Sequence, residues 1–535
     1  MRKCQPKNIP ANCWQALIEH KKKISDSSLA DMFMQDPKRA ENFSTTFNGL
    51  FVDYSKNYFD QETLSLLFAM AQDINLATTI KSLFSGAIVN QTENSAAMHM
   101  ALRAPADQPY FVDGENISKL IHTELQHMQE FISLLQANEI QGFSGKAVKT
   151  IINIGIGGSY FGAKLVTQAL ADFSVTNIEV HFVSNIDTQD IQSALAKSDP
   201  STTLFIIASK SFTTLETLHN TEIACNWLRK NGCHEPEKQL IAITANDAAA
   251  KTLGIRDEHI FHIWQWIGGR YSIWSAMGLP VAIKIGMKNF CAFLSGAYAV
   301  DQHFLTAPLE HNLPVILALI DIWYINFFHS RNFAIFPYDD SLNTLPAYIG
   351  QLFMESNGKQ IDNDGNKIGY QTAPVVWGGL GANAQHSFLQ ALHQGTIFSP
   401  VDFIVSLQPA TEKNAADNHA MIANCLAQSA TLMNGNMDQG TAPAYKDVIG
   451  NKPSTTILMD KLCPTSLGSL LCLYEHRCFV QSCVWNINPF DQWGVECSKT
   501  LSQEITHALM ENKFSSTYDL STKKMLAYYL GKTQS

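Results

Sequence analysis

Four short apolar runs rich in β-branched residues alternate with helical sequence in the first half of the chain. They cover residues 148–154, 178–183, 202–208 and 240–244. Strands that are apolar along their whole length are buried on both faces, which is typical of parallel sheets connected by helices. From about residue 118 the pattern therefore predicts a doubly wound parallel sheet, which binds ligands at the carboxyl ends of its strands.

A second set of strand-like runs follows a helical stretch that extends from about residue 275 to residue 356. Residues 374–377 and 401–407 are clear strands, and residues 455–459 form a weaker one. Residues 1 to about 117 and the residues after Phe490 read as helical. We therefore expect an α/β fold with two doubly wound domains, a helical N-terminal region and a C-terminal helical tail. The predicted boundaries are a large discontinuous α/β domain (1–117 and 286–490), a small α/β domain (118–285) and a helical arm (491–535).

The charge of the chain excludes some partners. Only 16% of the residues are charged, below the typical fraction of about 25%, so we expect a compact globular protein that buries much surface in its core and in a subunit interface. The net charge of −10, without a basic tract, argues against nucleic acid and anionic membranes as partners. The most apolar segment, residues 314–328, is short for a membrane span and is interrupted by Asp321, so it predicts a buried core helix.

The N-terminal sequence and the cysteines indicate the cellular compartment in which the protein is expected. The sequence up to Trp14 has no apolar core of signal-peptide length. Eleven cysteines occur without a Cys-x-x-Cys pair, and five of them lie on apolar sequence near the C-terminus. This pattern favours reduced core thiols of a cytosolic protein over zinc ligands or a disulfide framework.

Glu355 is the first candidate for chemistry. An apolar run, residues 352–354, carries it into the sequence Ser356-Asn357-Gly358, whose residue types bend a backbone. Partial desolvation at the end of an apolar element raises a carboxylate's pKa toward the range useful for a general base. Taken alone, however, the stretch favours a structural carboxylate at a helix end.

Two loops that follow predicted strands have the composition of ligand-binding loops. The first, residues 155–166, is a glycine turn that opens a helix, but Tyr160 stands where a dinucleotide fingerprint needs glycine. This argues against a nicotinamide dehydrogenase. The second, Ser209–Thr217, has five hydroxyls and one lysine within nine residues, which suits a phosphate monoester. The alternative is simple N-capping, which needs only one Ser or Thr.

Three more polar residues are candidates for a ligand-binding or catalytic site. Arg270 follows two glycines and could stabilise an oxyanion, although a structural ion pair fits equally well. His386 lies beyond a strand and a glycine loop, whereas His393 reads as structural. Lys499 closes a motif that begins at Pro489.

Six motifs together resemble the glucose-6-phosphate isomerase family, and they occur in the family's order. They are Gly-Ile-Gly-Gly-Ser (155–159), Ser-Lys-Ser-Phe-Thr-Thr-Leu-Glu-Thr (209–217), Gly-Gly-Arg-Tyr-Ser-Ile-Trp-Ser-Ala (268–276), Met-Glu-Ser-Asn-Gly-Lys (354–359), Gln-His-Ser-Phe-Leu-Gln (385–390) and Phe-Asp-Gln-Trp-Gly-Val-Glu (490–496). The N-terminal region also matches, in residues 53–57 and around Thr92-Glu93, so the resemblance covers nearly the whole chain. It implies α/β domains of the sugar-isomerase type and an aldose–ketose isomerase that interconverts glucose 6-phosphate and fructose 6-phosphate in glycolysis and gluconeogenesis.

The resemblance implies a role for each matching residue. Glu355 matches the base that moves a proton between C2 and C1 through a cis-enediol(ate), and Arg270 matches the cation that stabilises this intermediate. His386 matches the ring-opening group, Glu216 the carboxylate that orients this histidine, and Lys499 the partner in ring opening at the C1 oxygen. The other matches are substrate-binding positions, mainly around the phosphate: Gly158, Ser159, Ser209, Lys210, Ser211, Thr214 and Gln351.

The family also implies an assembly. In it the ring-opening histidine reaches the site from the partner subunit, so we expect a cytoplasmic homodimer with an active site shared across the interface. The implied ligand is a small sugar phosphate, and the implied reaction needs neither a metal nor another cofactor.

The sequence departs from the family pattern at several positions without removing a group that the mechanism needs. Ser211 stands where threonine is usual. Phe353 replaces a usual aspartate, and its ring could either make the surroundings of Glu355 more apolar or face the core. Three further departures are Ser95 for a usual arginine, Gly379-Leu380 for Glu-Pro, and Cys497-Ser498 for Leu-Gly. A sugar-phosphate-binding regulator without catalysis is the alternative hypothesis, and it would need the loop 209–217 but not Glu355, His386 and Lys499 together.

Overall fold

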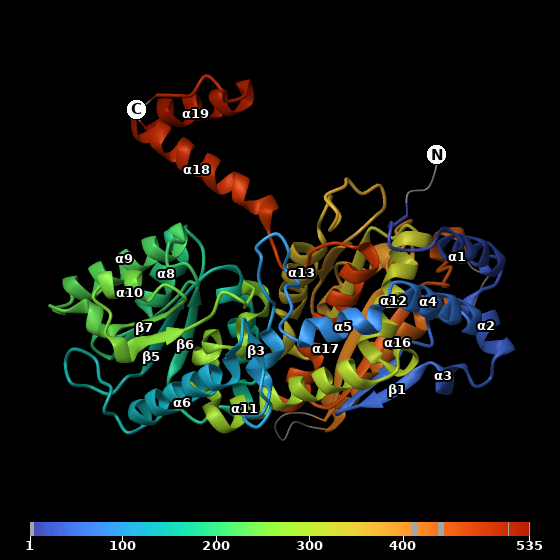
Figure 1. Ribbon diagram of the computed structural model, residues 1–535, viewed down its shortest axis with the longest axis horizontal. Coiled ribbons are helices and arrows are strands. Elements are labelled where there is room, and N and C mark those ends of the chain that lie inside the picture. The colour runs from blue at the N-terminus through green and yellow to red at the C-terminus, as the bar shows by residue number, and fades with distance from the viewer. Residues whose placement is uncertain (1–4, 409–414, 437–442, 512, 534–535) are drawn as a thin grey trace. The chain divides into compact units, whose positions relative to one another are not determined.

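The computed structural model describes the chain except for residues 1–4, 409–414, 437–442, 512 and 534–535 (Figure 1). It divides into two units, Met1–Pro489 and Phe490–Ser535, each with its own internal packing. The first unit holds both α/β sheets, and the second is helical.

The first sheet is five-stranded and parallel throughout, in the order β6-β5-β7-β8-β9. Its strands are β5 (Thr150–Ile154), β6 (Glu179–Val183), β7 (Thr203–Ala208), β8 (Leu240–Thr244) and β9 (Ile260–His262). The four predicted strands are confirmed, whereas β9 was not predicted because three residues are too few for a pattern. The strand order reverses beside β5, so the loops after β5 and β7 border the crevice where such sheets bind ligands.

Helices cover both faces of this sheet. The helices α8 (Thr188–Ala196), α9 (Leu215–Lys230) and α10 (Asp247–Thr252) share one apolar core with strands β5 to β9. On the other side lie α6 (Ile117–Gln136), α7 (Phe161–Ala169) and α11 (Leu279–Thr306), which contact one another and the sheet edges (Figure 1). The doubly wound prediction is therefore confirmed for this sheet.

The second sheet has six strands in the order β1-β2-β13-β12-β10-β11. Its strands are β1 (Ser44–Phe47), β2 (Leu50–Asp53), β10 (Asn332–Pro337), β11 (Val375–Gly378), β12 (Val401–Gln408) and β13 (Ser454–Lys461). The last four are mutually parallel, and the hairpin β1–β2 joins them antiparallel through β13. The runs predicted at 374–377, 401–407 and 455–459 are confirmed as β11, β12 and β13.

Three strands of this sheet lie in stretches that the sequence pattern predicted as helical. The strand β10 contains a short apolar run, residues 333–336, that follows the polar residues 329–332, and periodicity alone does not separate a short apolar strand from a buried helix. The hairpin β1–β2 turns at Asn48-Gly49, both with positive φ (48° and 79°). Asn-Gly between apolar runs is a strong hairpin signal, so this strand pair was predictable.

Helices fill the rest of the first unit. The N-terminal region contains α1 (Ala11–Ile24), α2 (Leu29–Gln35), α3 (Arg39–Asn42), α4 (Gln61–Asp73) and α5 (Leu76–Phe84), followed by the short hairpin β3 (Phe111–Val112) and β4 (Glu115–Asn116). One face of the second sheet is covered by α14 (Gly381–Gln385), α15 (Leu389–His393) and α16 (Ala415–Asn434). The opposite side holds α12 (Leu313–Ile322), α13 (Leu345–Asn357) and α17 (Pro464–Trp485).

The helix α17 is buried almost all round and carries charged residues into the core. Arg477 binds both carboxylate oxygens of Asp321 at 2.6 Å and Asp402 Oδ2 at 2.6 Å. Arg103 pairs with Asp301 and Glu475 in the same way, at 2.6–2.7 Å. Breaking such a buried pair leaves an uncompensated charge and typically costs about 3–5 kcal/mol. The Arg477 pairs join α17 to α12 and β12, and the Arg103 pairs join the turn 99–103 to α11 and α17.

The apolar segment 314–328 is a buried core helix, as predicted. It forms α12 and a π-helical turn, Trp323–Phe327, and Asp321 is the partner of Arg477 rather than a membrane-facing charge. A second stretch, Ala276–Thr306, is long and apolar enough to cross a membrane, but 67% of its most apolar window is buried inside the protein. It therefore packs as a core helix.

The second unit contains α18 (Trp493–Glu511) and α19 (Leu520–Thr533), which confirms the predicted helical tail. Ala508, Tyr518 and Leu526 form its small apolar core, with Ile505, Leu509 and Phe514 packed against them. Many large apolar side chains of this unit are exposed, among them Leu520, Met510 and Tyr528.

The buried imidazole of His259 predicts a pH dependence of stability. Burial, assisted by the guanidinium of Arg256, lowers the pKa of His259 from 6.5 to about 4. The imidazole of the unfolded chain therefore binds a proton at a higher pH than the imidazole of the folded chain. The stability that comes from keeping His259 neutral is complete above pH 6.5 and is lost as the pH falls toward 4. Between pH 6.5 and pH 4 we expect protonation of His259 to decrease the free energy of unfolding by up to about 3 kcal/mol.

Urea unfolding of the wild type and of His259→Gln at several pH values across the window measures this contribution. The variant should show the shallower decline below pH 6.5, whatever its absolute stability. Parallel declines in the two proteins would contradict the prediction.

Candidate active site

The loops after β5 and β7 meet the segment 268–270 at the sheet edge. Residues 157–159 form a 3₁₀ turn directly after β5, and residues 269–274 form another. A Cβ atom at Gly158 would lie 2.0 Å from the carbonyl oxygen of Gly269, so the two backbones touch and only glycine fits. This contact places Ser159 and Arg270, distant in sequence, in neighbouring turns.

Arg270 is held in place by neutral acceptors. Its side chain is buried, its Nε donates to Ser356 Oγ at 2.6 Å, and its Nη2 donates to the carbonyl oxygen of Pro489. Its Nη1 lies 3.6 Å from Glu355 Oε2. The hydrogen bonds to Ser356 Oγ and to the Pro489 carbonyl hold the guanidinium, so its positive charge lies beside Glu355 in a fixed position.

Glu355 lies in the last turn of α13, as the sequence predicted, with a quarter of its side chain exposed (25%). Gln351, one turn earlier on the same helix face, donates from Nε2 to Glu355 Oε2 at 3.0 Å. Gln351 Nε2 would also lie 3.2 Å from a Cβ atom at Gly157, so it borders the turn after β5. The carboxylate is thus oriented by one hydrogen bond from Gln351 and by the ion pair with Arg270, both on Oε2, while part of it stays open to a ligand.

The Ser-Asn-Gly sequence after Glu355 works through its side chains. Ser356 Oγ is also within 3.0 Å of Tyr271 Oη, and Asn357 donates to the carbonyl oxygen of Cys478 at 3.1 Å. Lys359 Nζ donates to the carbonyl oxygens of Glu355 and Ser356 at 3.1 and 2.9 Å, which satisfies acceptors that a helix end leaves free. The helix end that carries Glu355 is therefore clamped.

The hydroxyl loop after β7 is folded on itself. Ser209 Oγ lies 3.1 Å from Thr214 Oγ1 and accepts from the amide of Phe212 at 3.1 Å, and Ser211 Oγ lies 2.8 Å from Thr213 Oγ1. Thr214 precedes α9, but its side chain makes no capping hydrogen bond there. The N-capping alternative therefore lacks its bond, and the first amides of α9 are not used by this side chain.

Lys210 joins this loop to the arginine segment. Its Nζ donates to the carbonyl oxygens of Gln265 and Ile267, both at 2.9 Å, and burial lowers the pKa of its ammonium group. The residue therefore ties the hydroxyl loop to the chain that leads into Gly268-Gly269-Arg270.

Three predicted site residues make no hydrogen bond or ion pair with the side chain of Glu355 among the described residues. Glu216 is half-buried in the first turn of α9, and His386 is exposed directly after α14. Lys499 belongs to the second unit, where its Nζ lies 2.7 Å from Glu496 Oε1. Within the described residues, the side chain of Glu355 contacts Gln351 and Arg270 but neither Glu216 nor His386.

Phe353 is one of the positions at which the chain departs from the family pattern. Phe353 is fully buried, stacks on Phe333 with ring centroids 6.2 Å apart, and meets Tyr474 edge-on. It faces the core and does not surround Glu355. Residue-by-residue matching missed the supporting roles of Ser356 and Lys359, although both lie in the Met-Glu-Ser-Asn-Gly-Lys motif beside Glu355.

Comparison with known proteins gives one consistent result. Residues 53–526 match the family model described as "Phosphoglucose isomerase". The glucose-6-phosphate isomerases of Marinomonas sp. (strain MWYL1) and Shewanella halifaxensis (strain HAW-EB4) are each 44% identical, over 96% of this chain and 97% of theirs. The crystal structure of a glucose-6-phosphate isomerase from Chlamydia trachomatis D/UW-3/Cx is similar with a TM-score of 0.87 and 30% identity, over 97% of this chain and 99% of that one.

Proposed function

The chain belongs to the phosphoglucose isomerase family, and on that premise we propose how its residues interconvert glucose 6-phosphate and fructose 6-phosphate. It is an aldose–ketose isomerase, and the interconversion is a step of glycolysis. Moving a carbonyl between C1 and C2 needs a base that carries one proton and a fixed positive charge beside the oxyanion. The observation that supports the proposal most is a partly open carboxylate, Glu355, 3.6 Å from the buried guanidinium of Arg270.

Glu355 acts as the base. In the open-chain aldose it takes the proton from C2, the C–H electrons form the C1–C2 double bond, and the carbonyl electrons move onto the C1 oxygen. The C2 hydroxyl then gives its proton to the C1 oxygen, the electrons of that O–H bond form the C2 carbonyl, and the electrons of the C1–C2 double bond take back the same carbon-bound proton at C1, which gives the ketose. The hydrogen bond from Gln351 keeps the carboxylate turned toward this position.

Arg270 stabilises the cis-enediol(ate) that forms in between. The negative charge develops on an oxygen of the substrate, and a buried guanidinium acts on it through a low dielectric. Its anchors, Ser356 Oγ and the Pro489 carbonyl, hold it in place, so little reorganisation is needed as the charge develops.

The phosphate of the sugar binds at the hydroxyl loop. Ser209, Ser211 and Thr214 supply hydroxyl donors, and the first amides of α9 add the positive end of a helix dipole. Gly158, Ser159 and Gln351 line the neighbouring turn, as their family matches imply. The substrate-binding role of Lys210 stays a prediction, because its ammonium is engaged by the Gln265 and Ile267 carbonyls.

Ring opening comes before the proton transfer and uses residues that make no hydrogen bond or ion pair with Glu355 in the described part of the chain. We assign it to His386 of the partner subunit, which acts at the ring oxygen and is oriented by Glu216, and to Lys499 at the C1 oxygen. An exposed His386 supports this assignment, since a group that serves a neighbouring site must be accessible on its own chain. The active protein is then a homodimer whose sites are shared across the interface.

This proposal also defines the partners and the location. The steps described above rely on acid–base and electrostatic groups of the chain itself. With a net charge of −10, the partner is a small sugar phosphate rather than nucleic acid or a membrane surface. The ten cysteines of the described residues are free thiols, which supports a reducing cytoplasmic location.

Subunit complementation tests the proposed activity and the shared site together. Glu355→Gln and His386→Ala chains carrying different affinity tags are co-expressed, and the heterodimer is purified on both tags. One of its two sites then combines an intact Glu355 with an intact His386. We expect about half of the wild-type rate of glucose 6-phosphate formation from fructose 6-phosphate, because dimer sites are equivalent by symmetry.

The matched control is a doubly tagged dimer in which both chains carry Glu355→Gln, which should stay inactive. A heterodimer as inactive as this control would place His386 and Glu355 of one site in the same chain and overturn the shared site. Absence of activity in the wild type would refute the isomerase itself, so the two failures are distinguishable.

A further inference from the structure

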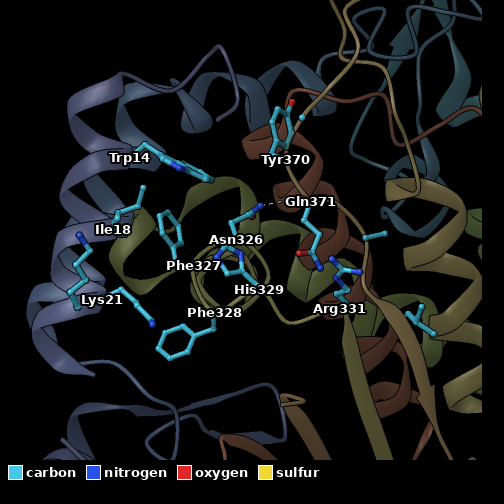
Figure 2. A pocket seen from close by; sticks show the side chains of 14 residues that line it. Trp14, Ile18, Lys21, Asn326, Phe327, Phe328, His329, Arg331, Tyr370 and Gln371 are labelled. Carbon is cyan, nitrogen blue, oxygen red and sulfur yellow. Dashed lines mark hydrogen bonds between the residues drawn. The ribbon is translucent and has the colours of Figure 1, made fainter. Parts of the chain in front are cut away.

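A cavity of about 730 Å³ lies between α1, the segment 326–331 and residues 369–375 (Figure 2). None of its fourteen lining residues belongs to the candidate active site. Its volume falls within the range of roughly 300–1,000 Å³ that small-molecule sites occupy. The lining combines an aromatic floor with a cationic rim, which neither the proposed isomerisation nor the core packing requires.

The floor consists of fixed aromatic rings. Trp14 and Phe327 are buried, with ring centroids 4.6 Å apart. Tyr370 forms part of the wall and is anchored by its hydroxyl, which donates to the carbonyl oxygen of Trp485 at 2.6 Å. Trp14 and Phe327 are almost fully covered, with 4% and 5% of their surface exposed. The aromatic surface open to a planar group is therefore that of the half-buried rings of Phe328 and Tyr370.

The rim is positive. Lys21, Lys22 and Arg331 line the cavity, and no aspartate or glutamate does. Within the part of the chain that the structure describes, none of the three makes an ion pair with a carboxylate. Figure 2 shows Lys21 and Arg331 on opposite sides of the cavity. Lys21 Nζ lies over the ring of Phe328, 5.1 Å from its centroid. Three cations without a carboxylate partner around one cavity stand out in a chain of net charge −10.

The backbone between the two sides is unusual. Residues 323–327 form a π-helical turn, a geometry that occurs frequently at functional sites. It is followed by His329, which has a φ of +59° although it is not glycine. Two hydrogen bonds hold this backbone to the opposite wall, from Asn326 to the carbonyl oxygen of Gln371 at 2.8 Å and from Gln371 to that of Ser330 at 2.7 Å.

We propose that this cavity binds a nucleoside polyphosphate, with its base on the aromatic floor and its phosphates between the cations of the rim. The volume suits a ligand of this size, the rings suit a planar base, and cations on two sides suit a chain of several phosphates rather than a single charge. A sugar monophosphate has no planar group for the floor, so the site differs in kind from the proposed catalytic site.

Calorimetric titration with ATP, without added metal, tests the proposal on the full-length protein. Saturating fructose 6-phosphate is present throughout, so that ATP does not occupy the catalytic phosphate loop. We expect one ATP per chain and weaker binding at high salt. Lys21→Gln combined with Arg331→Gln should weaken ATP binding by about tenfold or more, since each removes a charged hydrogen-bond donor.

The matched control is Lys119→Gln combined with Lys230→Gln, two exposed lysines outside the cavity that give the same change in charge. It should bind ATP as the wild type does, and both double variants should retain isomerase activity. Equal loss in the two variants would show a general charge effect and overturn the site, as would no binding at millimolar ATP. Adenosine and inorganic triphosphate should each bind more weakly than ATP, and triphosphate binding as tight as ATP would overturn the role of the aromatic floor.

Discussion

Glu355→Gln is expected to lower kcat by about 10²–10⁴-fold while KM for fructose 6-phosphate changes little. The amide has nearly the shape of the carboxylate and can still pair with Gln351, but it cannot accept the proton from carbon. A positioned general base is typically worth that factor in rate. Because Glu355 is not in the predicted phosphate loop, substrate binding should survive, and the loss should fall on kcat rather than KM.

Isotope exchange separates loss of the base from general damage. Wild-type protein should exchange part of the deuterium at C2 of glucose 6-phosphate with solvent, because a carboxylate that is 25% exposed holds the proton between the two transfers. The Glu355→Gln protein should show no such exchange. The control is Glu139→Gln, an exposed glutamate in another part of the chain, which should behave as wild type. Near-normal turnover in Glu355→Gln would show that another group is the base.

The strands of the first sheet were predictable because their signal is local. Each is an apolar β-branched run bounded by turn residues, and the parallel pairing follows from the helices between them. The strand β10 was not predictable in this way, since its apolar run of four residues, 333–336, also fits a buried helix. The hairpin β1–β2 could have been predicted from Asn48-Gly49 but was not.

Some features of the candidate site could be predicted from the sequence, and others could not. Glu355 at a helix end, the hydroxyl loop after β7 and the glycine turn after β5 could be placed from sequence, because each is a local motif beside a predicted element. The links between them could not. The contact of Gly158 with Gly269 and the bond from Arg270 to Ser356 join segments that are distant in the chain, and their geometry depends on packing.

The partners of the buried charged residues could not be predicted from the sequence either. Asp321 could be recognised as an interruption of an apolar helix, but its partner Arg477 lies in another helix and is reached only through the fold. The cationic cavity is a further case, because Lys21 and Arg331 come together only when α1 packs beside the segment 326–331. Sequence pattern identifies residue types for a function, whereas tertiary packing decides which of them meet.

Arg270→Lys is expected to lower kcat by about 10²-fold or more, although the positive charge is kept. A lysine ammonium is a single point and cannot hold Ser356 Oγ and the Pro489 carbonyl while also facing Glu355, as the planar guanidinium does. The charge would then lie away from the developing oxyanion. Losing one preorganised oxyanion donor typically costs about 10²–10³-fold in kcat.

Steady-state kinetics with fructose 6-phosphate measure this effect, and thermal unfolding checks that the protein still folds. The matched control is Arg229→Lys, an exposed arginine in α9, which should leave kcat and stability unchanged. Ser356→Ala provides a second test, because it removes the acceptor at 2.6 Å from Arg270 Nε and should lower kcat through the same displacement. If Arg270→Lys kept wild-type kcat, charge alone would suffice, and the fixed geometry beside Glu355 would not be what stabilises the intermediate.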